Sequence, residues 1–348
     1  MNARVILTPL PALRMALVLL ALVGGCSRKP DESKPGKPGD LETLVLRYEG
    51  TAGNVAYAEL AEELGYLAPI KLEYVGNNST GGPHSIQAVV TGDTDIGSSF
   101  NGAIIKLIAA KAPLKAVVAS YGTDVETFNG FYVLEDSPIK SARDLVGKHV
   151  AMNTLGAHSE FALKEYLARA GLTAEQAKQV SMIQLPSINI ELSLREKQVE
   201  VASLGQIFRP KALERGGIRP LFTDYDMFGA FNAGSYVMSN HFIAQNPNTV
   251  RKFVDAVGRA IDWARAQPRE VVVARMRDLV KKRGRGETDE AVRYWRSPGV
   301  ATPHGTLTDA DYQVWIDWLV KDGQLPKGRV TPDDIYTNSF QPSSVASR

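Results

Sequence analysis

The chain has 348 residues, of which 44% are hydrophobic and 22% charged, so it is long enough to build two lobes that each bury a core. Its 40 Lys and Arg residues against 38 Asp and Glu give a net charge of +2, which excludes the strong positive field that attracts nucleic acid. An internal disulfide is excluded because Cys26 is the sole cysteine.

Residues 1–26 predict a lipoprotein signal peptide. Arg4 and Arg14 precede an apolar run, Met15 to Gly25, that is shorter than the roughly 20 residues of a membrane-spanning helix. The string Leu22-Val-Gly-Gly-Cys26 resembles the bacterial lipobox, in which cleavage before the cysteine leaves a thiol that carries a lipid. Cys26 is therefore the expected lipidation site, and the alternative is an ordinary cleaved signal with a chance cysteine.

Residues 27–40 predict a flexible tether, because this stretch has three prolines and no aliphatic or aromatic side chain to bury. From residue 41 onward, runs of strand and helix alternate with glycine-rich loops, which predicts parallel strands joined by helices. The first series has expected strands at 41–48, 70–75, 95–97 and 115–120, with helices ending near 65 and covering 83–91 and 102–110.

A second series repeats this order. Strands are expected at 131–134, 149–152, 201–205 and 235–238, and helices at 157–169, 191–199 and 209–215. From about residue 247 amphipathic helices dominate, at 250–266, 268–282, 289–295 and 308–321. Their four tryptophans lie in apolar stripes, which favours a place in the core over a ligand cage: Trp263, Trp295, Trp315 and Trp318.

Three strings in this order resemble the periplasmic solute-binding proteins of the nitrate, sulfonate and taurine transporter family, and the resemblance covers residues 43–340. They are Val89-Val-Thr-Gly-Asp-Thr-Asp-Ile-Gly97, Lys111-Ala-Pro-Leu-Lys-Ala-Val-Val118 and, at the entrance of the second lobe, Ile139–Ala151. The string Lys197-Gln-Val-Glu-Val-Ala202 departs from the family's glycine-containing turn, so the alignment is weaker around residues 198–210.

The resemblance implies an α/β fold: a two-lobed periplasmic-binding-protein type II clamshell, in which each lobe is a mostly parallel sheet flanked by helices. Lobe 1 is expected to comprise residues 41–127 and 236–348, the latter with the helical C-terminal tail, and lobe 2 residues 128–235. Closure is expected by rotation near residues 125–131 and 232–236.

Ligands of open α/β sheets bind beyond the carboxyl ends of the strands, where helix N-termini offer free N–H groups. The polar residues of the loops at those ends are therefore the candidate ligand-binding residues, although helix capping alone also selects Ser, Thr and Asn there. They are Thr51, Asn54, Asn77, Ser79, Thr80, Ser98, Ser99, Asn101, Tyr121, Asn153, Thr154, His158 and Ser159. Arg209 is the nearest cationic candidate, with a surface position as the simpler interpretation.

The expected function is that of a substrate-binding lipoprotein of an ABC importer, which captures a small solute and delivers it to the permease and its ATPase. The resemblance suggests a sulfonate, taurine, nitrate or a related organic molecule. The protein is expected to be exported to the periplasm or cell surface, lipid-anchored to a bacterial membrane and monomeric, with no catalytic residue, cofactor, metal or nucleic-acid partner.

Two alternatives stay open. A ligand-sensing receptor domain would use the same fold and tether. An enzyme like the pyrimidine synthases of this fold would need, by that resemblance, a cysteine-rich stretch, and none follows Cys26; the five histidines also lack metal-ligand spacing.

Overall fold

The computed structural model describes residues 39–78 and 81–343. The chain from Gly39 onward forms one compact unit. No helix within the described ranges combines the length and apolar character that a bilayer crossing requires. The predicted signal peptide, Cys26 and nearly all of the predicted tether lie outside the described residues.

Lobe 1 contains two groups of strands. In the first, β1 (Val45–Gly50) pairs in parallel with β2 (Lys71–Asn77). In the second, β10 (Phe231–Ser239) runs antiparallel between β3 (Gly97–Phe100) and β4 (Leu114–Thr123). The carbonyl of Arg47 in β1 accepts hydrogen bonds from the N–H groups of Asp95 and Ile96, which places β1 beside the chain that enters β3.

Helices cover this lobe. The longest, α10, packs its buried face on α1 and repeats apolar residues at helical spacing, as in Val250, Phe253, Val254 and Val257. The helical segments are α1 (Tyr57–Glu63), α2 (Gly82–Thr91), α3 (Asn101–Ala109), α9 (Asn240–Gln245), α10 (Pro247–Ala266), α11 (Arg269–Lys282), η2 (Ala291–Tyr294), η3 (Pro303–Gly305), α12 (Ala310–Lys321) and α13 (Pro332–Ile335).

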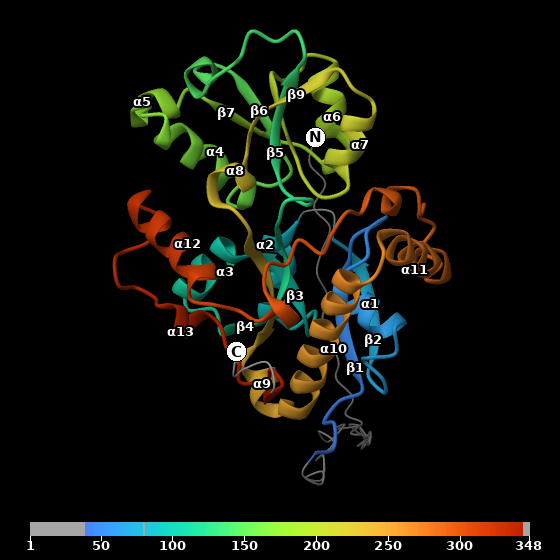
Figure 1. Cartoon of the computed structure of the whole chain (residues 1–348). Helices are drawn as coiled ribbons and strands as arrows, with labels where there is room; N and C mark the ends of the chain where they lie inside the picture. Colours follow the sequence, from blue (N-terminus) through green and yellow to red (C-terminus); the bar gives the residue numbers. More distant parts are fainter. Residues whose placement is uncertain (1–38, 79–80, 344–348) are drawn as a thin grey trace, which may run out of the picture. The chain divides into compact units, whose positions relative to one another are not determined.

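Lobe 2 is built on one sheet in the order β7-β6-β8-β5-β9, drawn in green and yellow in Figure 1. β6 is parallel to β7 and β8, whereas β5 is antiparallel to β8 and β9. The strands are β5 (Gly130–Leu134), β6 (His149–Met152), β7 (Ser181–Gln184), β8 (Val201–Leu204) and β9 (Ile218–Thr223). The helical segments are η1 (Ala142–Leu145), α4 (His158–Arg169), α5 (Ala174–Ala177), α6 (Ser187–Arg195), α7 (Phe208–Glu214) and α8 (Asp224–Phe228).

The chain passes between the lobes twice, before β5 and after β9, and the fully buried carboxylate of Asp224 joins the two passages. Its Oδ1 accepts the backbone N–H of Asn129 at 3.0 Å, and its Oδ2 accepts the hydroxyl of Thr123 at 3.0 Å. One side chain therefore holds the end of β4, the first passage and the start of the second passage together.

The predicted α/β architecture of helix-flanked sheets is confirmed. Two short strands, β7 and β9, were not predicted, and the expected helix at 289–295 is a single 3₁₀ turn, η2. The boundary expected at residue 235 falls inside β10, because Phe231–Ser239 pairs along its length with lobe 1 strands. The second passage accordingly precedes residue 231.

Candidate functional site

A cavity of about 520 Å³ lies where the two lobes meet. It is lined by the segments that follow β1, β2, β6 and β7, by residues of β3, β4 and β8, by the first passage between the lobes, and by residues 295–298. These are the carboxyl ends of the parallel strands, the expected place for a ligand in sheets of this kind. The volume falls within the range typical of sites for small organic molecules.

Ten of the thirteen residues predicted to bind ligand line this cavity: Thr51, Asn54, Asn77, Ser98, Ser99, Tyr121, Asn153, Thr154, His158 and Ser159. Ser79 and Thr80 lie outside the described residues. The structure thus brings loops from both lobes together around one space.

Asn101 lies elsewhere. It is fully buried, donates to the backbone carbonyls of Asn232 and Asp311 at 3.0 and 3.1 Å, and accepts the hydroxyl of Ser235 at 2.8 Å. These bonds hold the start of α3 against β10 and α12. It comes directly after the cavity-lining residues of β3, but its side chain enters the core, a difference that residue type does not reveal.

On the lobe 1 side, the cavity meets the N-terminus of α2. The N-cap, Gly81, supplies no side-chain cap, Pro83 has no N–H, and the N–H groups of His84 and Ser85 donate to the carbonyl of Gly81, so within the described residues the open N–H of the first turn is that of Gly82. The hydroxyl of Ser99 lies below this turn; it is 2% exposed and has no hydrogen-bond partner among the described residues. The neighbouring Ser98 is paired with Ser120 at 2.7 Å. An unpartnered hydroxyl and the positive end of the α2 dipole therefore lie next to each other on this side of the cavity.

On the lobe 2 side, the cavity meets the N-terminus of α4. Its N-cap, Ala157, also lacks a side-chain cap, and His158 and Ser159 in its first turn line the cavity. Ser159 shares a hydroxyl and amide cluster with Ser203 and Asn129: the Ser203 hydroxyl lies 2.9 Å from that of Ser159, and Asn129 Nδ2 donates to it at 3.1 Å.

Sequence reasoning missed Asn129 and Ser203. A signal for Ser203 existed, since it is a hydroxyl within the otherwise apolar run Val201–Leu204. Asn129 stands in the passage just before β5, where its position relative to the cavity depends on how the two lobes meet.

His158 connects the lobes. Its ring stacks on Phe100 of β3 with centroids 5.4 Å apart and an interplanar angle of 6°. Its Nε2 lies 2.9 Å from Oδ2 of the buried Asp224. The Phe100 ring and the nearby carboxylate thus enclose the imidazole from two sides.

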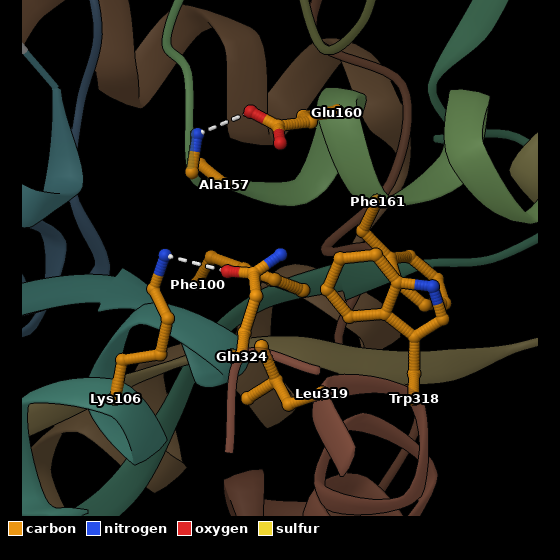
Figure 2. Close-up of a pocket in the computed structure, with 10 residues that line it drawn as sticks. Phe100, Lys106, Ala157, Glu160, Phe161, Trp318, Leu319 and Gln324 are labelled. Carbon is orange, nitrogen blue, oxygen red and sulfur yellow. Dashed lines mark hydrogen bonds between the residues drawn. The ribbon is translucent and has the colours of Figure 1, made fainter. Parts of the chain in front are cut away.

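The lobes also touch each other directly, both at the cavity and beyond it. An ideal Cβ on Gly81 of lobe 1 would lie 2.5 Å from the hydroxyl of Thr154 in lobe 2. Phe161 of α4 packs edge-on against Trp315 of α12, with ring centroids 4.0 Å apart. Lys164 Nζ forms an ion pair with Asp322 Oδ2 at 3.1 Å. Figure 2 shows a hollow in this region, with Phe161 and Trp318 at one side; its volume of about 10 Å³ is too small for a solute.

A buried ionic network supports the cavity loop 50–56 from behind. Arg283 pairs with Glu59 at 3.0 Å and Glu287 at 2.5 Å, and all three side chains are at most 6% exposed. Arg283 also donates to the carbonyl of Asn54, and Glu287 accepts the N–H of Gly53. Burial alone would raise the pKa of Glu287, but the Arg283 guanidinium and the Gly53 N–H outweigh it and hold that pKa below its usual value of 4.5.

Other candidates have structural places. Arg209 lies 3.6 Å above the ring of Phe128 and donates to the carbonyl of Glu126, so it braces the first passage. Trp315 is 1% exposed, as its apolar stripe predicted, whereas Trp295 lines the cavity. Burial raises the pKa of Tyr121, another lining residue, so its phenol is a neutral donor.

The comparisons with known proteins point to one family. A family model described as NMT1/THI5 like matches residues 53–271. A protein named as a binding protein in Brucella abortus strain 2308 is 24% identical over 272 residues, which cover 75% of this chain and 79% of that protein.

Among solved structures, the periplasmic aliphatic sulphonate binding protein SsuA of Escherichia coli is similar with a TM-score of 0.63 and 22% identity, covering 84% of this chain and 91% of its own. The periplasmic nitrate-binding protein NrtA of Synechocystis PCC 6803 gives a TM-score of 0.68 at 15% identity, and the match covers 86% of this chain and 88% of that protein. The desulfurization enzyme DSZB is similar with a TM-score of 0.57 and 19% sequence identity, and the match covers 86% of this chain and 97% of the enzyme. At these identities the likeness shows the type II periplasmic binding fold, which binding proteins and an enzyme share.

Proposed function

The chain belongs to the NMT1/THI5-like family, and we propose that it is the solute-binding component of an ABC importer, which captures a small organic anion between its lobes and delivers it to the permease. The observation that carries the proposal is the unpartnered Ser99 hydroxyl below the open first turn of α2. A buried donor without an acceptor costs free energy, and an anion at this place would satisfy it.

The donors come from both lobes. An anionic group between the N-termini of α2 and α4 would accept N–H and O–H bonds from Ser99 on one side and from Ser159 or His158 on the other. The anion would therefore bind more tightly when the two lobes lie close together than when they are apart. This difference in affinity would drive closure of the lobes.

The cavity favours an organic anion over a bare inorganic one. A volume of about 520 Å³ is far larger than one oxyanion needs. Aromatic and aliphatic side chains share the lining with the polar groups, among them Tyr48, Tyr57, Tyr121, Phe128, Ile190, Ile207, Phe208 and Trp295. An anion at the helix N-termini would leave these side chains to contact an organic body, and SsuA, a neighbour of the same fold, binds aliphatic sulphonates.

Export and lipid attachment complete the proposal. The protein would be cleaved before Cys26, lipidated there and held at a bacterial membrane, with residues 27–40 as the tether. The two structural neighbours named as periplasmic support the compartment. In this arrangement the lobes face the permease of the importer, and a monomer suffices for delivery.

A catalytic role has two observations in its favour: DSZB shares the fold, and His158, which lies beside Asp224, lines the cavity. Binding without turnover is nonetheless the simpler role for a site whose open donors come from helix N-termini. Incubation with the bound compound followed by mass spectrometry separates the two roles, since a binding protein returns its ligand unchanged.

The proposal is tested by a thermal-shift screen of the full chain in mild detergent against sulfonates, carboxylates, nitrate, taurine and neutral analogues. A ligand present at a hundred times its dissociation constant adds about 2.7 kcal/mol to the stability of the folded state. We expect dose-dependent stabilisation by organic anions and none by their neutral analogues. Stabilisation by neutral compounds alone, or by no compound, would reject the proposal.

A further inference from the structure

Residues 295–298 line the cavity although they lie beyond the family-model match, which ends at residue 271. They connect η2 with η3 and follow the long helix α11. A lining segment outside the matched region is a place where this chain can differ in ligand preference from other members of its family.

The backbone of this segment is firmly held. The guanidinium of Arg269 donates to the carbonyl of Trp295 at 2.8 Å. The hydroxyl of Ser297 donates to Asp124 at 2.8 Å, and Thr127 donates to the carbonyl of Ser297 at 3.3 Å. The carbonyl groups on either side of Arg296 are therefore both held by hydrogen bonds. That of Trp295 is bound by Arg269 of α11, and that of Ser297 by Thr127 of the first passage.

The side chain of Arg296 is uncommitted. No hydrogen bond or ion pair joins it to any of the described residues, and it is exposed at the cavity. Other arginines close to the site are occupied: Arg209 on Phe128, and Arg283 and Arg285 on Glu59. An arginine is charged at every physiological pH, and its planar group binds a carboxylate or sulfonate with two parallel hydrogen bonds.

The geometry points to Arg296 as a specificity-determining residue that selects ligands with a second anionic group. This inference rests on the proposed function: one anionic group binds at the N-termini of α2 and α4, and the other reaches Arg296 across the cavity. The substrate class is an organic dianion, such as a sulfonate that also carries a carboxylate. The one carboxylate lining the cavity, within the described residues, is Glu49, which lies 3.3 Å from His84 Nδ1.

The test uses ligand pairs that differ in the second charge alone. The dissociation constants of 4-sulfobenzoate and 4-toluenesulfonate are measured by titration calorimetry with the full chain in mild detergent, and 3-sulfopropionate and 1-propanesulfonate serve as an aliphatic pair. We expect the dianion to bind about tenfold tighter in at least one pair, equivalent to about 1.4 kcal/mol. Arg296→Gln should remove this preference, so that the dianion loses far more affinity than the monoanion.

The matched control is Arg143→Gln, which removes the same charge from an exposed site on lobe 2 outside the cavity. It should leave both affinities as they are. Equal affinities within both pairs, or an equal loss for mono- and dianion in Arg296→Gln, would overturn the inference while the proposed function stands. Tighter binding of taurine, which carries an ammonium instead, would also overturn it. If no anion of any kind binds, the proposed function itself fails.

Discussion

An ideal Cβ on Gly82, the first residue of α2, would lie 2.5 Å from the hydroxyl oxygen of Ser99 and 2.8 Å from its Cα. The absence of a side chain at residue 82 is therefore what lets β3 approach the open turn of the helix. This contact gives the cavity a buried hydroxyl and a helix N-terminus at the same point, and the proposed anion site depends on both.

Ser99→Ala is expected to weaken anion binding without destabilising the protein. The hydroxyl makes no hydrogen bond within the described structure, so its removal relieves a desolvated polar group, whereas the ligand loses a donor worth about 1.5–3 kcal/mol. Calorimetry and thermal unfolding measure the two effects. Thr94→Ala is the matched control, because Thr94 Oγ1 is likewise buried and unpartnered but does not line the cavity. A large loss of stability in Ser99→Ala would contradict this assignment.

Gly81→Ala is expected to impair ligand binding by keeping the lobes apart, because the added Cβ would meet the Thr154 hydroxyl at 2.5 Å. The backbone of Gly81 has φ of 93°, so part of the effect is conformational strain. Gly65→Ala separates the two causes, since Gly65 has φ of 77° and open space around it. Both variants should lose stability, but binding should fall in Gly81→Ala alone. Equal affinities in the two variants would argue against contact of the lobes at this point.

Arg283→Ala is expected to cost about 3–5 kcal/mol of stability, since it leaves Glu287 and part of Glu59 buried without their cation. Because Arg283 also holds the carbonyl of Asn54, ligand affinity should fall as well. Chemical denaturation and calorimetry check both. Its neighbour Lys282 pairs with Glu63 on the surface, so Lys282→Ala should change stability by about 1 kcal/mol or less. Similar losses of stability in the two variants would show that the buried ion pairs of Arg283 contribute no more than a surface pair.

The stability of the protein should fall in acid partly through Glu287. Its folded-state pKa lies below the usual 4.5, so its contribution is fully present above that value and is lost as the pH falls through the lowered pKa. Glu287→Gln should therefore be less stable than the parent above pH 4.5 and approach it below. Melting temperatures across this range give the comparison. A constant difference between variant and parent at every pH would show that the carboxylate charge is not responsible.

Cys26→Ser is expected to release the exported protein from the membrane, because lipid attachment is proposed at this thiol. Cell fractionation of parent and variant measures the partition. A variant that stays with the membrane would point to another means of attachment.

Much of the fold follows from local pattern. Apolar runs bounded by glycine loops identified most strands, and the apolar spacing of Val250, Val254 and Val257 identified α10. The short strands β7 and β9 were not predicted because neither is an unbroken apolar run. β7 ends in Gln184, and β9 contains Arg219 and Pro220. Strand pairing, set by tertiary contacts, decides such segments.

The site was predictable as a set of loops and less so residue by residue. Ser99 and Asn101 are close in sequence and similar in type, yet Ser99 lines the cavity and Asn101 ties α3 to the core. Asn129 reaches the cavity from the first passage between the lobes, and Arg296 reaches it from a segment far along the chain, after the return to lobe 1. Local pattern carries no information on those long-range contacts.

The most direct test of the anion site is a crystal structure of the protein with 4-bromobenzenesulfonate, in which the anomalous signals of bromine and sulfur fix the orientation of the ligand. We predict the sulfonate within hydrogen-bonding distance of the Ser99 hydroxyl at the N-terminus of α2, with the ring inside the cavity between the lobes. A sulfonate bound away from both helix N-termini, or a cavity that stays empty at saturating ligand, would contradict the account.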